Sequence, residues 1–114
     1  MGYILIKNGN VIANGKIENK TILIKDGYIC DTDFKGAVPE NCDVIDAFGK
    51  YVSPGFVDIH LHGGGGFDFM DCTREAFQAI AKTHLLNGTT TAVPTAVSSE
   101  MSDILNLVDT YREC

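Results

Sequence analysis

The sequence predicts an α/β fold in two parts, a small antiparallel β-sheet over residues 1–53 and a strand–helix–strand–helix run over residues 54–114. In the first part, turn dipeptides separate short runs of β-branched residues. In the second part, helical spacing alternates with short apolar runs, which is typical of parallel strands joined by helical crossovers. Hydrophobic residues make up 45% of the chain and charged residues 21%, as in ordinary globular proteins, so composition excludes disorder.

The strands of the first part are bounded by Asn-Gly and Asp-Gly pairs. These pairs occur at positions 8–9, 14–15 and 26–27, between runs rich in isoleucine, leucine and valine at 3–7, 11–13, 21–25 and 28–30. Such pairs supply the positive φ angles of tight hairpins. A polar connection at 31–43 precedes two further short strands at 44–46 and 50–52. We therefore predict a small, partial domain that is β-sandwich-like.

The second part begins with a compact apolar strand at 56–62, directly after Ser53-Pro54-Gly55. A helix is predicted over 74–86, capped by Thr73 or Asp71 and stopped by Asn87-Gly88. Its apolar face has helical spacing and comprises Phe77, Ile80, Ala81, His84 and Leu85.

A second strand at 89–93 ends at Pro94, and a second helix is predicted to follow a cap at Ser98 or Ser99. The apolar face of that helix comprises Met101, Ile104, Leu107, Val108 and Tyr111. Two strand–helix units cannot bury both faces of a parallel sheet, and a complete (β/α)8 barrel takes about 250 residues. We therefore expect the chain to be the start of a TIM-type barrel, incomplete as it stands.

The net charge, the apolar runs and the cysteine spacing indicate which partners and which cellular compartment to expect. The net charge of −6 argues against a nucleic-acid partner, which would require a basic surface. No apolar run is long enough for a membrane span, and the first residues do not resemble a signal peptide. No two of the four cysteines are separated by two residues, the spacing of a zinc knuckle or a redox motif. We therefore expect reduced thiols in a cytoplasmic protein. The alternative is a secreted domain with two disulfides.

His60 and His62 are the candidate metal ligands. Alternate side chains of a strand share a face, so both imidazoles are predicted to point one way, together with Asp58. Val57, Ile59 and Leu61 form the opposite row, which is suited to packing beneath helices. A bare His-x-His has little specificity, but here it ends a buried strand, where barrel active sites form. Two neutral imidazoles there can bind one zinc, iron, nickel or cobalt ion.

The segment PGFVDIHLHG at 54–63 resembles the opening strand of the amidohydrolase superfamily. The extension GGGGFDFMD at 63–71 and the segment NGTTTAVPT at 87–95 are similar to its N-acetylglucosamine-6-phosphate deacetylase branch. The resemblance covers the whole chain. It implies a divalent metal cofactor, zinc or iron, with His60 and His62 as first-strand ligands.

The same resemblance places the remaining ligands, a glutamate and two histidines, and the catalytic aspartate beyond residue 114. No catalytic residue is therefore assigned within the chain, and we expect these 114 residues to be inactive alone. For the full-length protein the resemblance implies hydrolysis of N-acetylglucosamine 6-phosphate to glucosamine 6-phosphate and acetate. It also implies an amino-sugar phosphate substrate and a homodimer.

Other polar residues are weaker candidates for a role in the site. His84 suits packing better than ligation because it lies on the apolar face of a helix. The glycines at 63–66 are interpreted as a turn rather than a phosphate cradle, since the lysine of a nucleotide-binding loop is missing. Asp58 either orients a ligand imidazole or lines the barrel interior. Asp68 and Asp71 are predicted to be loop and cap residues, and Thr95 is a candidate for lining the pocket.

Two other readings stay open. One is another amidohydrolase, such as a dihydroorotase, a hydantoinase or an amino-acid deacetylase, which downstream residues would distinguish. In the ring-opening branches, a carboxylated lysine of the barrel replaces a bridging glutamate. The other is a non-catalytic scaffold module that keeps the β-sheet and has lost the metal.

Overall fold

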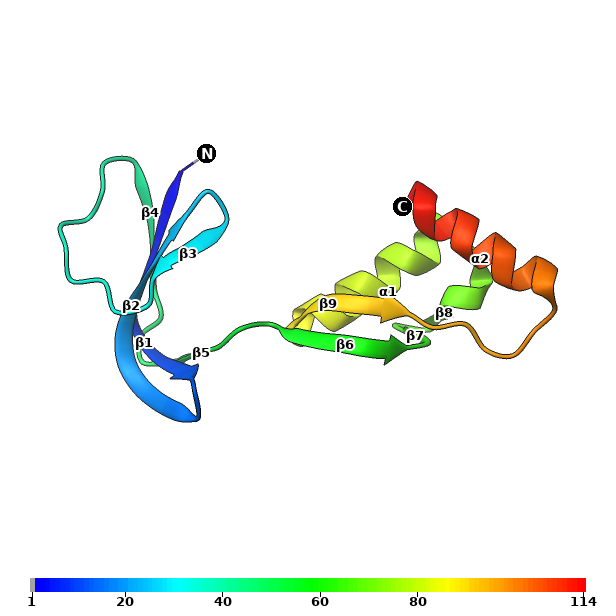
Figure 1. Ribbon diagram of the computed structural model, residues 1–114, viewed down its shortest axis with the longest axis horizontal. Coiled ribbons are helices and arrows are strands. Elements are labelled where there is room, and N and C mark those ends of the chain that lie inside the picture. The colour runs from blue at the N-terminus through cyan, green and yellow to red at the C-terminus, as the bar shows by residue number, and fades with distance from the viewer. Residues whose placement is uncertain (1) are drawn as a thin grey trace. The chain divides into compact units, whose positions relative to one another are not determined.

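The computed structural model describes residues 2–114. The chain divides into two compact units, Met1–Pro54 and Gly55–Cys114, and each is described by itself. Figure 1 shows the order of their elements along the chain. The first unit consists of strands, and the second combines strands with helices.

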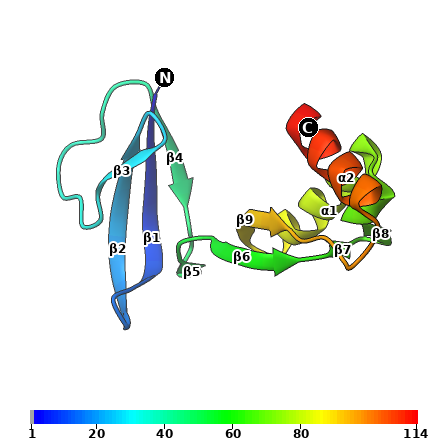
Figure 2. The same ribbon diagram turned by 45° about the vertical axis from the view of Figure 1, so that its right-hand side comes forward.

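The first unit is a five-stranded sheet with the strand order β3-β2-β1-β4, and β5 also pairs with β1. Its strands are β1 (Tyr3–Ala13), β2 (Lys16–Lys25), β3 (Tyr28–Asp31), β4 (Cys42–Asp46) and β5 (Tyr51–Val52). Figure 2 shows β1 between β2 and β4. The predicted hairpins at 14–15 and 26–27 are confirmed, because β1, β2 and β3 pair antiparallel across them.

The sheet differs from the prediction on one side, because β4 and β5 run parallel to β1. An antiparallel neighbour can follow a two-residue turn, whereas a parallel one requires a longer crossover. The polar connection after β3 supplies that length, since no strand interrupts residues 32–41. The sheet is therefore mixed, and its antiparallel part is limited to the first three strands.

Asn8-Gly9 was predicted to form a hairpin turn, and that prediction is wrong. β1 continues through it, and the register with β2 shifts between Ile6 and Gly9, which marks a β-bulge. Asn8 has a positive φ of 57°, and its carbonyl accepts the N–H of Gly49 at 2.8 Å. A Cβ at Gly9 would lie 2.7 Å from Cγ2 of Val52. Glycine is required there by close packing rather than by a turn.

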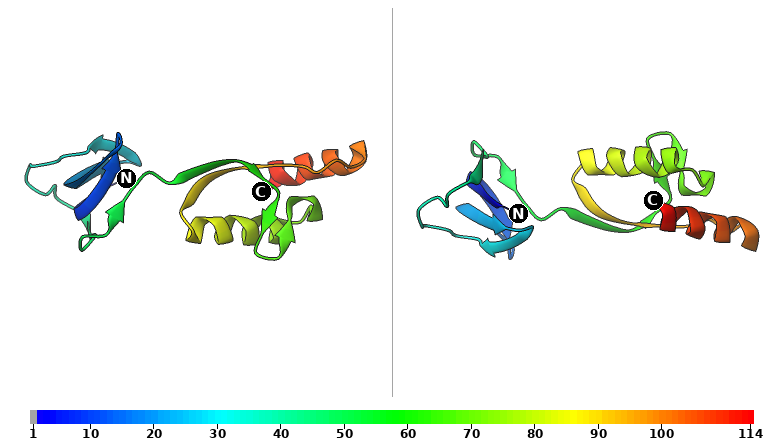
Figure 3. Two further views of the ribbon diagram at one scale, coloured as in Figure 1. Left: turned by 90° about the horizontal axis from the view of Figure 1, so that it is seen from below. Right: turned by 90° about the horizontal axis from the view of Figure 1, so that it is seen from above.

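The second unit contains the parallel strands β6 (Phe56–Leu61) and β9 (Thr89–Pro94) and the helices α1 (Arg74–Leu86) and α2 (Met101–Glu113). The predicted strand–helix–strand–helix order is confirmed. Between β6 and α1 lie a small hairpin, β7 (Gly63–Gly64) and β8 (Phe67–Asp68), and the one-turn helix η1 (Phe69–Asp71). Figure 3 shows α1 on one side of the strand pair β6 and β9, and α1 contacts β9. The core is formed by Leu61, Phe69, Phe77, Ile80 and Leu107.

The two helices begin differently. Thr73 caps α1, because its side-chain oxygen accepts the N–H of Ala76 at 3.2 Å, as predicted. The predicted serine cap of α2 is wrong, since its N-cap is Glu100, without a side-chain cap bond. The hydroxyl of Ser99 donates to the carboxylate of Asp103. Across residues 2–114, no helix is both long and apolar enough to span a membrane.

Candidate metal centre

The end of β6 places the two candidate ligands side by side, with His60 in the strand and His62 directly after it. The Nε2 atoms of His60 and His62 lie 3.2 Å apart, and the ring centroids are 5.0 Å apart at an interplanar angle of 72°. The prediction that both imidazoles share one face is confirmed by this contact. Leu61, between them, points the other way into the core and is 8% exposed. The strand register therefore fixes both histidines through the burial of their neighbour.

The rest of the opposite row is not covered within this chain. Val57 is 64% exposed and Ile59 is 76% exposed, so the prediction that they pack beneath helices holds only for Leu61. The reason is the arrangement of neighbours, since within residues 2–114 β6 pairs with β9 alone. A strand in a parallel sheet is normally flanked and covered on both sides.

The histidine pair fits one side of a metal site. Zinc–nitrogen bonds of about 2.0–2.1 Å at a tetrahedral angle place two ligand nitrogens about 3.3 Å apart, close to the observed separation of the Nε2 atoms. The Nδ1 atom of His62 is buried without a hydrogen-bond partner among the described residues. Within residues 2–114, no third His, Cys, Asp or Glu joins the pair. The donors present thus fit a divalent ion but supply two of its ligands.

Thr95 fixes the end of β6. Its side-chain oxygen accepts the N–H of Leu61 at 3.1 Å, and its own N–H donates to the Leu61 carbonyl at 2.8 Å. Leu61 is the residue between the two histidines. Thr95 therefore holds the backbone from which both imidazoles project.

Asp58 also acts on the backbone. One oxygen of its carboxylate accepts the N–H of His60 at 3.0 Å. This contact does not decide between the two roles predicted for Asp58, which are orienting a ligand imidazole and lining the barrel interior. Asp58 thus stabilises the strand backbone at His60.

The glycines after His62 form an ordered hairpin, in agreement with their interpretation as a turn. Gly65 and Gly66 at its tip have positive φ angles of 65° and 90°, a region that glycine occupies without strain. Asp68 and Asp71 are loop and cap residues, as predicted. The Asp68 carboxylate accepts the N–H of Met70 at 2.8 Å, and the Asp71 carboxylate accepts the N–H of Asp68 at 2.9 Å.

His84 lies on α1 and reaches this hairpin. Its Nε2 lies 3.0 Å from the carbonyl oxygen of Gly63. Sequence reasoning placed His84 on the packing face of the helix but missed this hydrogen bond. The available signal was a polar residue within an apolar stripe, on the helix that follows a glycine-rich loop.

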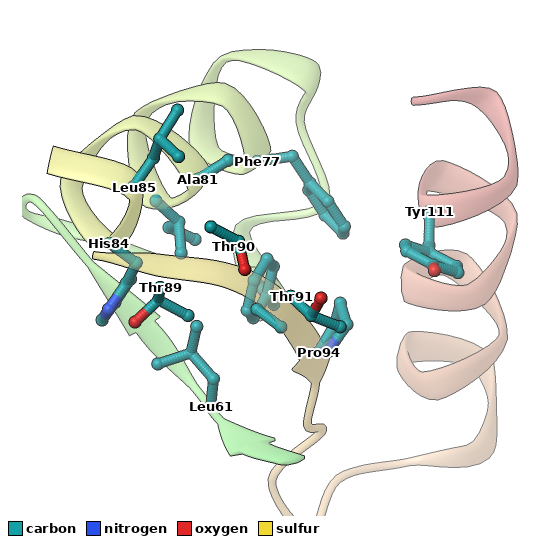
Figure 4. A pocket seen from close by; sticks show the side chains of 13 residues that line it. Leu61, Phe77, Ala81, His84, Leu85, Thr89, Thr90, Thr91, Pro94 and Tyr111 are labelled. Carbon is teal, nitrogen blue, oxygen red and sulfur yellow. The ribbon is translucent and has the colours of Figure 1, made fainter. Parts of the chain in front are cut away.

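A hollow of the second unit lies on the helix side of the strands. It is lined by residues of α1, β9 and α2, including Phe77, Leu85, Thr91 and Tyr111, as Figure 4 shows. Neither His60 nor His62 lines it. Leu61, which does line it, points away from the histidine face. This hollow is therefore a gap between helices and strands and is separate from the metal pair.

Comparison with curated proteins relates the chain to enzymes of known type. The dihydroorotase of Staphylococcus aureus (strain N315) is 39% identical over 94 residues, which cover 79% of this chain and 20% of that enzyme. The dihydroorotase of Staphylococcus epidermidis (strain ATCC 12228 / FDA PCI 1200) is 33% identical over 113 residues, which cover 96% of this chain and 25% of that enzyme. The chain thus spans about a fifth to a quarter of the length of these relatives.

Comparison with solved structures points to another branch. The N-acetylglucosamine-6-phosphate deacetylase of Pasteurella multocida superposes with a TM-score of 0.86 at 26% identity, covering 97% of this chain and 30% of that one. The profile of the Amidohydrolase family matches residues 51–113, which include β6 and both histidines. Because this match extends over more than half of the sequence, the chain belongs to the amidohydrolase family.

Proposed function

We propose that the chain is the amino-terminal part of a metal-dependent deacetylase. The full-length enzyme would hydrolyse N-acetylglucosamine 6-phosphate to glucosamine 6-phosphate and acetate. The observation that carries this proposal is the pair of Nε2 atoms 3.2 Å apart at the end of β6, directly before a glycine hairpin. The likeness to the Pasteurella multocida deacetylase, with a TM-score of 0.86, supports the choice of substrate.

His60 and His62 would hold a divalent ion, zinc or iron. When bound, such an ion lowers the pKa of water and polarises an amide carbonyl. The chain's own residues supply position. Asp58 and Thr95 fix the backbone around the two imidazoles through their bonds to the N–H groups of His60 and Leu61. We expect the remaining ligands and the catalytic aspartate in the rest of the protein.

The loop after His62 favours the acetamide substrate over a carboxylate. Residues 63–73 contain four glycines and no lysine or arginine, so this loop offers no cation to a carboxylate next to the metal pair. Dihydroorotate carries a carboxylate, whereas the acetamide group of an N-acetylated sugar is neutral. The glycine hairpin is compatible with a neutral acetamide group beside the metal pair because its backbone can approach closely.

A dihydroorotase or hydantoinase-like activity is the second candidate. The identity of 39% with the Staphylococcus aureus dihydroorotase favours it. Both reactions are hydrolyses at an amide carbonyl, so the metal pair serves either one. The two candidates differ in the group that the enzyme must bind beside the scissile bond.

The test uses the full-length protein, purified with its metal. We expect acetate release from N-acetylglucosamine 6-phosphate and no interconversion of dihydroorotate and carbamoyl aspartate. His60→Ala and His62→Ala should each remove bound metal, measured by elemental analysis, together with the activity. Lys82→Ala, a change at an exposed position of α1, is the matched control and should keep both.

Turnover of dihydroorotate without acetate release would replace the deacetylase proposal by the second candidate. A protein that keeps its function after His60→Ala would be a scaffold instead. The 114 residues alone should release no acetate with added zinc or iron, because catalytic zinc usually takes three protein ligands. We also propose that the full-length protein is a cytoplasmic homodimer that binds no nucleic acid. Its molecular mass in solution would test the dimer.

A further inference from the structure

His84 holds the hairpin that follows the metal pair. Its Nε2 lies 3.0 Å from the carbonyl oxygen of Gly63, a residue 21 positions away in the sequence. A carbonyl oxygen only accepts hydrogen bonds, so Nε2 of His84 carries the hydrogen and donates. The contact is partly buried, which limits competition from water. α1 is thereby tied to the first residue after His62.

The same imidazole leaves no room for a side chain at position 64. A Cβ at Gly64 would lie 2.6 Å from Nε2 of His84, closer than real Cβ atoms approach, and 3.2 Å from Cδ2, which is a tight contact. Gly64 is not among the glycines with positive φ, whereas Gly65 and Gly66 are. Glycine at position 64 is therefore required by the space that the His84 ring occupies, and not by the backbone conformation.

The hairpin in turn fixes His62. The carbonyl of His62 accepts the N–H of Phe69 at 2.9 Å, and the carbonyl of Gly63 accepts His84. The Nδ1 atom of His62 is buried and has no hydrogen-bond partner among residues 2–114. Because no partner holds Nδ1, the placement of the His62 backbone, which these two bonds set, contributes to the direction of the ring together with the contact to His60.

We propose that His84 is a positioning residue for the metal pair, acting through the Gly63 carbonyl on the backbone of His62. This inference rests on the proposed function, because it requires a divalent ion held by His60 and His62. His84 itself is not a ligand. Through His84, α1 holds His62 at the observed spacing from His60.

The test compares variants of the full-length enzyme. His84→Leu removes the donor but keeps bulk, His84→Gln restores an N–H at similar reach, and Asn87→Ala removes a bond at the same helix end that does not reach the hairpin. Zinc affinity is measured by competition with a chelator, alongside the melting temperature of the metal-free protein and the absorption spectrum of the cobalt-substituted protein.

Direct hydrogen-bond partners of metal ligands change metal affinity by about 10–100-fold. His84 acts one residue further away, so we expect a loss of up to about 10-fold in His84→Leu, with an altered cobalt spectrum. His84→Gln should recover most of the affinity and the native spectrum. Asn87→Ala should bind zinc as the unmodified enzyme does. A role of His84 in helix packing alone would change the melting temperature and leave affinity and spectrum as they are.

Gly64→Ala provides a second route if His84→Leu does not fold. The added methyl displaces the imidazole and should weaken zinc binding, whereas adding Gly64→Ala to His84→Ala should cost little more, because the ring is already gone. Unchanged zinc affinity in His84→Leu or in Gly64→Ala would overturn the inference. So would a His84→Gln enzyme as weak as His84→Leu. If the unmodified enzyme binds no metal at all, the proposed function itself fails.

Discussion

Replacing Thr95 by valine removes one hydrogen-bond acceptor and keeps the shape of the side chain. The side-chain oxygen of Thr95 accepts the N–H of Leu61 at 3.1 Å, and Leu61 is 8% exposed. Valine would leave that N–H buried without an acceptor. Leaving a buried donor unsatisfied costs about 1–3 kcal/mol. The cost falls on the peptide between His60 and Leu61, next to both histidines.

Native-state hydrogen exchange measures this cost at a single amide. A loss of about 1–3 kcal/mol should accelerate exchange of the Leu61 amide about 5- to 150-fold in Thr95→Val, since 1.4 kcal/mol corresponds to about a factor of ten. Thr95→Ser keeps the oxygen and should keep most of the protection. If the Leu61 amide exchanges equally slowly in the threonine and valine proteins, the assignment of Thr95 to the strand end is refuted.

Two further predictions concern the core of the second unit and the loop after β4. Ile80 is fully buried at 0% exposure, so Ile80→Ala should lower the free energy of unfolding by about 2–5 kcal/mol in denaturant titrations, against less than about 0.5 kcal/mol for the exposed Lys82→Ala. The backbone N–H of Phe48, with smaller contributions from Asn8 and Lys7, lowers the pKa of Asp46. A carboxyl with a lowered folded-state pKa stabilises above its unfolded value, near pH 4, and loses that contribution as pH falls through the folded value. The melting temperatures of the unmodified and Asp46→Asn proteins should therefore differ most near neutral pH and converge below about pH 4; a constant difference would contradict this account.

Local patterns were sufficient to predict most elements. The alternation of β6 placed His60 and His62 on one face because side chains of a strand repeat every two residues. The helical spacing over 74–86 placed Phe77 and Ile80 in the core. Each of these features is encoded by residues within a few positions of one another. Their prediction needs no knowledge of the rest of the chain.

Predictions failed where two local signals competed. Asn8-Gly9 has the composition of a hairpin turn, but β1 continues through it as a bulge against β2. Ser99 has the chemistry of a helix cap, but its hydroxyl bonds to the carboxylate of Asp103. In each case the local preference was real, and a packing or side-chain partner decided between its possible outcomes.

By itself, the sequence determined the strand and helix periods, the two hairpins at 14–15 and 26–27, and the shared face of His60 and His62. Only the tertiary structure decided that β4 and β5 run parallel to β1, that Thr95 braces Leu61, and that His84 reaches Gly63. The last two contacts join residues 34 and 21 positions apart. Periodicity is a property of neighbouring residues, whereas these bonds exist only once separate elements have packed together.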